Sequence, residues 1–193
     1  MNMKDAYSVE RMADRMQIQD VMYRWCRAVD RLDFEGIRAV FHPDATDTHG
    51  PYDGGVEGLI DWIRERHLAI PFSMHAISNI LIEFASADLA LVETYVRTIQ
   101  QYPPEAKAAL AQLAGGREGA AGAGVDLFTG SRYADRFERR DGEWRIARRT
   151  LIHDWKQLVE VSPNAPKTLD HWVKGTRSRQ DFVYRERAAM GIA

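Results

Sequence analysis

The chain has 193 residues, enough for one domain with additions, since domains average about 150 residues. Hydrophobic residues make up 45% of it and aromatic residues 10%, which excludes an intrinsically disordered protein. Its 26 Lys and Arg residues against 28 Asp and Glu residues give a net charge of −2, without a long basic run to neutralise phosphates. We therefore expect no nucleic-acid partner.

The location of the protein is predicted from its cysteine content and its hydropathy. The single cysteine, Cys26, excludes an intramolecular disulfide and a multi-cysteine metal site. Residues 1–15 are charged and contain no apolar run, so they do not form a secretory signal. No segment reaches the 18 or so apolar residues that cross a bilayer. We expect a soluble, cytoplasmic protein that does not bind membranes.

The first part of the chain predicts three helices. Apolar residues recur every three or four positions from Ser8 to about Arg31, which predicts a helix with one buried face. A second short helix is expected from Asp33 to Phe41, where Pro43 stops it. After a polar strand from Ala45 to Tyr52 and a glycine turn, helical spacing returns from Glu57 to Leu68.

The second part predicts long strands. Phe72 to Phe84 and Leu89 to Gln101 are rich in β-branched and aromatic residues, and a short polar break joins them as a hairpin. Residues 103–124 contain a short helical stretch and then many small residues, which predicts a flexible insertion. Val125 to Arg139 and Glu143 to Trp155 form a second expected hairpin around Asp141-Gly142.

Helices followed by a meander of antiparallel strands predict an α+β fold, with the helices packed on one face of a curved sheet that encloses a pocket. We expect one such domain over residues 1–160. The tail over residues 161–193 has no clear period and is expected to act as a lid or as an arm between subunits.

Asp30 and His75 are the first candidates for chemistry. Asp30 borders the buried face of the first helix, where the usual role of such an acid is an ion pair with Arg27 or Arg31. Strand alternation places His75 and Asn79 on the same face. A histidine there is usually structural, but an acidic partner would fix its tautomer and raise its basicity.

The other histidines divide by predicted element. His49 and His153 fall on strands and are candidates to line a cavity, whereas His42, His67 and His171 are expected at the surface. The sequence contains no H-E-x-x-H motif, phosphate loop, dinucleotide fingerprint or G-x-S-x-G motif. We therefore expect neither a metal nor a cofactor.

Four segments together resemble one family: Ile18 to Asp30, Phe41 to Ala45, His75 to Asn79, and Arg132 to Ile146. In order and separation they are similar to SnoaL-like members of the nuclear transport factor two-like superfamily. This resemblance implies a cone-shaped, cystatin-like α+β roll, with the N-terminal helices on the concave face of the sheet and a pocket between them.

Within that superfamily the sequence is similar to the hexachlorocyclohexane dehydrochlorinase, scytalone dehydratase and bile acid dehydratase group, which uses an aspartate and a histidine to abstract a proton. Asp30 and His75 match those positions. The resemblance also implies Arg148 as an active-site arginine, counted from Trp144. The chain departs from the group at Trp25, where the relatives have a lysine or a tyrosine that stabilises the leaving group.

The sequence thus predicts a cofactor-free lyase or isomerase acting on a small, hydrophobic, cyclic molecule, with His75 as the base and Asp30 as its partner. The expected substrate-binding residues are Tyr23, Trp25, Asn79, Tyr133, Arg148 and His153. Trp25, Trp62 and Phe72 are expected to form an apolar wall.

Two other functions stay open at this point. The same fold serves as a non-catalytic ligand-binding or protein-assembly module, and as the small subunit of aromatic-ring dioxygenases. The resemblance also implies a homodimer or a homotrimer.

Overall fold

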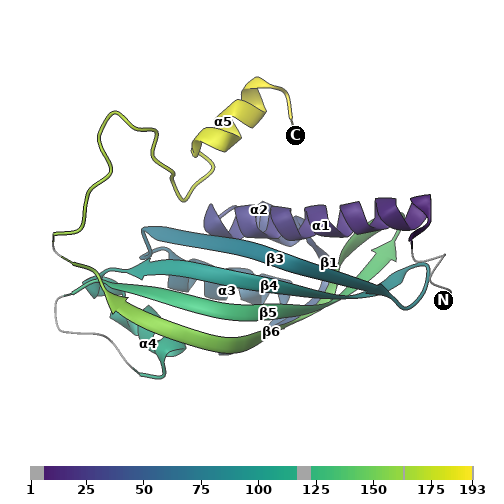
Figure 1. Ribbon diagram of the computed structural model, residues 1–193, viewed down its shortest axis with the longest axis horizontal. Coiled ribbons are helices and arrows are strands. Elements are labelled where there is room, and N and C mark those ends of the chain that lie inside the picture. Colours follow the sequence, from purple (N-terminus) through teal and green to yellow (C-terminus); the bar gives the residue numbers. More distant parts are fainter. Residues whose placement is uncertain (1–6, 117–122, 163, 193) are drawn as a thin grey trace.

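The computed structural model describes residues 7–116, 123–162 and 164–192 (Figure 1). Its helices are α1 (Val9–Asp30), α2 (Phe34–Ala39), α3 (Val56–His67), the 3₁₀ turn η2 (Pro104–Ala106), α4 (Lys107–Ala114) and α5 (Phe182–Ala189). Its strands are β1 (Phe41–His49), β2 (Tyr52–Gly55), β3 (Phe72–Phe84), β4 (Leu89–Tyr102), β5 (Val125–Arg140) and β6 (Glu143–Glu160).

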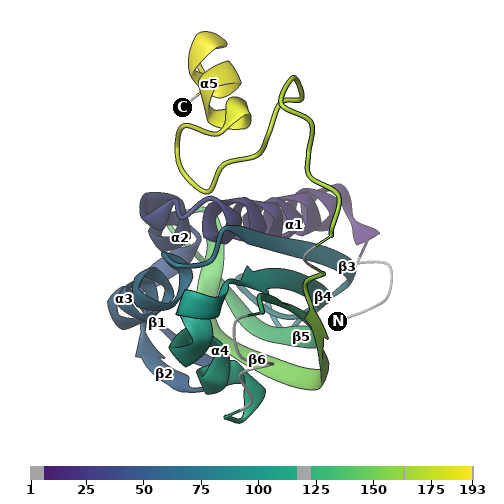
Figure 2. The same ribbon diagram turned by 90° about the vertical axis from the view of Figure 1, so that its left-hand side faces the viewer.

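The strands form one six-stranded sheet in the order β2-β1-β6-β5-β4-β3. All neighbours are antiparallel except β1 and β6, which run parallel. The sheet is curved and unclosed, and α1, α2 and α3 gather on one side of it (Figures 1 and 2). The predicted α+β fold with N-terminal helices on a curved sheet is confirmed.

The main core lies between α1, α3 and the sheet. Ser8 caps α1 by accepting a hydrogen bond from the backbone N–H of Arg11, and α1 then buries Ile18, Met22 and Trp25 completely. Burying such side chains contributes about 1.5–3 kcal/mol each, so this stripe fixes α1 on the sheet. Asp30, the last residue of α1, is thereby held next to β3.

The first strand begins earlier than its sequence suggests. Pro43, which was expected to stop the second helix, lies inside β1, where the pairing with β6 is interrupted between Phe41 and Thr46. A proline lacks a backbone N–H, and a break in the ladder is a place where it costs no hydrogen bond. The second helix is correspondingly short and ends at Ala39.

Two strands contain β-bulges that change which side chains face inward. In β3 the pairing with β4 skips Asn79, which adopts a positive φ of 46°. In β6 the pairing with β5 skips Ala147, since Arg136 pairs with Arg148 and Phe137 pairs with Ile146. An extra residue reverses the inward and outward alternation beyond it.

The insertion and the tail each contain some regular secondary structure. Residues 104–114 form η2 and α4, which confirms the short helix expected there, and residues 117–122 of the expected flexible insertion lie outside the described part. The tail follows β6 and contains α5, a helix that the sequence pattern did not predict (Figure 1). No helix in the described part of the chain combines the length and apolar character needed to cross a membrane.

Candidate active site

Asp30 and His75 form a close pair where the end of α1 meets β3. The Nδ1 atom of His75 lies 2.7 Å from Oδ1 of Asp30, and the backbone N–H of His75 donates to Oδ2 at 2.9 Å. The hydroxyl of Ser73 donates to Oδ1 at 3.2 Å. A carboxylate with these donors makes His75 carry its proton on Nδ1, which leaves Nε2 with a lone pair.

The His75 side chain lines a cavity between the sheet and the helices. The cavity has a volume of about 40 Å³, room for a few water molecules, so a ring-sized ligand requires some lining side chains to move. Its walls are mostly polar, with Val96, Leu113 and Leu151 as the aliphatic members. The polar members are His49, Arg66, His75, Thr98, Gln100, Thr129, Ser131, Tyr133 and His153.

Two further histidines face this cavity, as their strand positions predict. His49 lies with Nδ1 at 3.2 Å from Oδ1 of the buried Asp47, and burial lowers the pKa of His49 despite that carboxylate. His153 lies with Nδ1 at 3.1 Å from the Ser131 hydroxyl, and burial also lowers its pKa. Both imidazoles are therefore neutral at pH 7 and able to exchange a proton with a ligand.

The expectation that His42 and His67 lie at the surface is wrong. His42 is buried with Nε2 at 2.9 Å from the carbonyl oxygen of Glu138. His67, at the end of α3, is also buried, and its pKa is lowered well below the usual range by burial and by the guanidinium groups of Arg66 and Arg177. His42 was expected in a turn but lies in β1, and the end of a helix, where His67 lies, gives no local signal of burial.

The predicted substrate-binding residues divide into two groups. Tyr133 and His153 line the cavity with His75. Trp25 lies behind it in the core, where its indole N–H donates to the Tyr133 hydroxyl at 3.2 Å. Tyr23 is 54% exposed on the outer face of α1, and Asn79 is exposed at the β3 bulge, so neither reaches the cavity.

The family resemblance implies Arg148 as the inward-facing arginine, but the structure buries its neighbour Arg149 instead. Arg148 is exposed, whereas Arg149 is fully buried and forms a bidentate ion pair with Asp135 at 2.7 and 2.8 Å. The bulge at Ala147 reverses the alternation of β6, which is why counting from Trp144 selects the outward residue. Arg149 packs 4.0 Å from the ring centre of Tyr133, behind the cavity wall.

Trp25, Trp62 and Phe72 do not form the expected apolar wall of the cavity. Trp62 covers the guanidinium group of Arg66 at 4.3 Å, and Phe72 is 41% exposed. Phe72 borders a second cavity, of about 470 Å³, between the start of β3 and tail residues 168–177. Asp30 borders this second cavity while His75 lines the first, so the pair lies between the two.

Several polar residues of the site were not predicted from the sequence. Among them, Arg66 lines the cavity from the last turn of α3, Gln100 lines it from β4, and Arg177 approaches Asp30 from the tail. Arg66 directly precedes His67, which was itself expected at the surface. A buried arginine at the end of an amphipathic helix has no distinguishing pattern, so the sequence offered no signal for it.

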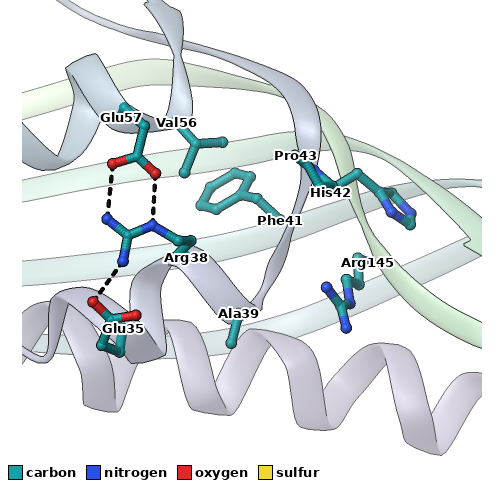
Figure 3. A pocket seen from close by; sticks show the side chains of 9 residues that line it. All are labelled: Glu35, Arg38, Ala39, Phe41, His42, Pro43, Val56, Glu57 and Arg145. Atoms are coloured by element: carbon teal, nitrogen blue, oxygen red, sulfur yellow. Dashed lines mark hydrogen bonds and ion pairs between the residues drawn. The ribbon is translucent and has the colours of Figure 1, made fainter.

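A further cavity, of about 350 Å³, lies between α2, α3 and β1, away from the pair (Figure 3). Its charges are satisfied, because Arg38 binds both Glu35 and Glu57 and Arg145 pairs with Glu143. Across the described residues, no three His, Cys, Asp or Glu side chains gather as a metal site would require. The cavity beside His75 is therefore the better candidate for chemistry.

Comparison with known sequences places the chain in a family. The sequence profile of the SnoaL-like domain matches residues 10–150. The chain belongs to the SnoaL-like domain family. The uncharacterized protein Rv2910c of Mycobacterium tuberculosis is 26% identical over 155 residues, which cover 79% of this chain and 93% of that protein.

Solved structures of similar fold include proteins with named activities. The hexachlorocyclohexane dehydrochlorinase LinA-type3 of Novosphingobium barchaimii is 19% identical, with a TM-score of 0.62 over 83% of this chain and 99% of its own. A candidate scytalone dehydratase of Novosphingobium aromaticivorans is 20% identical, with a TM-score of 0.62 over 82% of this chain and 98% of its own. At these identities the similarity shows the nuclear transport factor two-like fold.

Proposed function

We propose that this SnoaL-like protein is a cofactor-independent lyase or isomerase that removes a proton from a small cyclic molecule. The observation that carries the proposal is the 2.7 Å contact between Asp30 Oδ1 and His75 Nδ1 beside a polar cavity. A candidate scytalone dehydratase and a hexachlorocyclohexane dehydrochlorinase among proteins of the same fold support a lyase reaction. The mixed lining favours a ring that carries oxygen substituents over a purely hydrophobic molecule.

The proposed reaction begins at Nε2 of His75. This atom takes a proton from a carbon of the substrate, and the Asp30 carboxylate stabilises the imidazolium that forms without itself becoming protonated. In a lyase the C–H electron pair forms a double bond as the neighbouring group leaves with its own pair. In an isomerase the same proton returns to another carbon. Positioned proton transfer of this kind contributes about 10²–10⁴ in rate.

The test is a product screen with matched variants. The purified protein is incubated with cyclic hydroxy, halo and keto compounds, and mass spectrometry detects loss of water, loss of acid or a new isomer. We expect His75→Gln and Asp30→Asn each to lower turnover by about 10²–10⁴, because each removes a part of the base. The control is His171→Gln, an exposed tail histidine.

Three results would contradict the proposal. If His75→Gln turns over a confirmed substrate at the wild-type rate, His75 is not the base. If no compound is converted but ligands bind the cavity, the non-catalytic ligand-binding function is favoured. If a large iron-bearing protein copurifies with the chain in every preparation, the dioxygenase small-subunit function is favoured instead.

A further inference from the structure

Arg66 is a buried charge without a counter-ion. Its residue is only 7% exposed, and no Asp or Glu among the described residues lies within ion-pair distance of it. The Nε atom of Arg66 is buried and makes no hydrogen bond, while one terminal nitrogen makes a long contact of 3.4 Å to the Tyr102 hydroxyl. Burying an unpaired charge is costly, so an acceptor is expected to complete this group.

The remaining partner of Arg66 is shared with another arginine. The ring of His67 faces Nη2 of Arg66 through its Nε2 atom and Nη2 of Arg177 through its Nδ1 atom. A neutral imidazole accepts a hydrogen bond at only one nitrogen, and a guanidinium group only donates. One of the two arginines therefore gains no hydrogen bond from His67.

Arg177 is the arginine that can do without this bond. Its guanidinium group also donates to the backbone carbonyls of Val29, Asp30, His67 and Ile70, at 2.9–3.3 Å. The other buried arginine, Arg149, has its charge balanced by Asp135. Arg66 lines the His75 cavity, has only neutral acceptors in His67 and Tyr102, and has neither a counter-ion nor an acceptor for its Nε atom.

We infer that Arg66 binds an anionic oxygen of the ligand, so that the cavity takes a ring bearing a carboxylate or a phenolate. This inference rests on the proposed function for its substrate ring, and it adds the charge of the substrate. Arg66 and His75 line the same cavity, so a ligand anion on Arg66 would leave the rest of the ring beside the base. Arg66 is then a substrate-binding residue that selects anions.

The experiment measures binding and needs no turnover. Benzoate and its neutral isostere benzamide are titrated into the ¹⁵N-labelled protein, and the arginine Nε–H resonances are followed by NMR. The Arg66 resonance is assigned by its loss in Arg66→Lys. We expect benzoate to bind at least tenfold more tightly than benzamide and to shift the Arg66 resonance, because the anion makes charge-assisted hydrogen bonds. A nitrophenol that is ionised at the pH of the titration, compared with its neutral methyl ether, tests whether the site takes a phenolate.

Substitutions of Arg66 distinguish the effect of its charge on binding from an effect on folding. Arg66→Met is expected to lower benzoate affinity at least tenfold and to leave benzamide affinity unchanged, while Arg66→Lys retains part of the preference. The matched control is Arg64→Met, on the same helix, where the side chain is exposed and paired with Asp61. If Arg66→Met does not fold, the wild-type comparison and the Arg66 resonance decide the question.

The inference is overturned if each anion binds no more tightly than its neutral counterpart, or if neither anion moves the Arg66 resonance. His75→Gln distinguishes this failure from failure of the proposed function. If His75→Gln binds benzoate normally and the product screen is negative, the anion site stands and the catalytic proposal fails. If turnover is found but neither anion binds preferentially, the catalytic proposal stands and the anion site is wrong.

Discussion

His49 and His67 show how burial sets the charge of individual residues in this protein. Both have a pKa below the usual value because burial disfavours the imidazolium form, and His67 also faces two guanidinium groups. The unfolded chain, with a histidine pKa near 6.5, then binds more protons below about pH 6.5 than the folded chain does. Their contribution to stability is complete above that pH and is lost as the pH falls.

We therefore predict that the free energy of unfolding decreases between pH 7.5 and pH 5.5, by at most about 1.4 kcal/mol per pH unit for each of these histidines. Urea unfolding at several pH values measures the slope. The slope should become smaller in His67→Gln and stay unchanged in His171→Gln, an exposed tail variant. Equal slopes in His67→Gln and the wild type would contradict this assignment.

Which residues form the site could be predicted from the sequence only where they match the family pattern. Asp30 and His75 were identified from the resemblance, and the structure brings them into hydrogen-bond contact. Arg66 and Gln100 were not identified, because each becomes part of the site only through the packing of α3 and β4 around one cavity. Sequence spacing carries no information on such contacts between distant elements.

At the scale of elements, the β6 bulge decides which arginine enters the core. Beyond the unpaired Ala147, Arg149 points inward to Asp135 and Arg148 points outward. We predict that Arg149→Met destabilises the protein by about 3–5 kcal/mol, because it leaves a buried carboxylate unpaired. The matched variant Arg148→Met should change stability by less than about 0.5 kcal/mol.

Chemical denaturation of the two variants measures this difference. Similar losses at positions 148 and 149 would show that the inward and outward assignments along β6 are wrong. The bounds of the long strands were largely predictable from their β-branched and aromatic content. The bulges at Asn79 and Ala147 were not, because a one-residue insertion leaves the local composition unchanged and alters only the pairing.

At the scale of the whole molecule, the tail is tied to the site through Arg177. Its guanidinium group links the end of α1 to the loop between α3 and β3, because it donates to the backbone carbonyls of Val29, Asp30 and Ile70. Burial lowers the pKa of Arg177 to about 10, so it remains charged at pH 7. The tail is thus anchored at Asp30 through Arg177. Its roles as a lid or as an arm between subunits stay predictions.

We predict that Arg177→Met lowers the free energy of unfolding by about 1–3 kcal/mol, since it removes charge-assisted hydrogen bonds to partly buried carbonyls. Arg179→Met is the matched control, because that side chain is 65% exposed and makes one ion pair with Asp33, for a loss below about 1 kcal/mol. Thermal unfolding compares the two. A larger loss in Arg179→Met would contradict the anchoring role of Arg177.

The fold class and the sheet hairpins were predictable because helical and strand periods alternate clearly along the chain. The attachment of the tail was not, because α5 has no apolar period and is fixed by single contacts such as the Tyr184 hydroxyl donating to Asp33 at 2.9 Å. One polar contact between distant residues leaves no trace in a local pattern. The position of the tail therefore required the three-dimensional structure.

In the proposed reaction, His75 presents an unprotonated Nε2 to the cavity while Asp30 holds the proton on Nδ1. Long-range ¹H–¹⁵N NMR at pH 8, with the His75 signals assigned by their loss in His75→Gln, observes the tautomer directly. We predict the Nδ1–H form in the wild type, and a weaker preference for it in Asp30→Asn. Observation of the Nε2–H form in the wild type would contradict the account, because His75 would then have no lone pair facing a substrate.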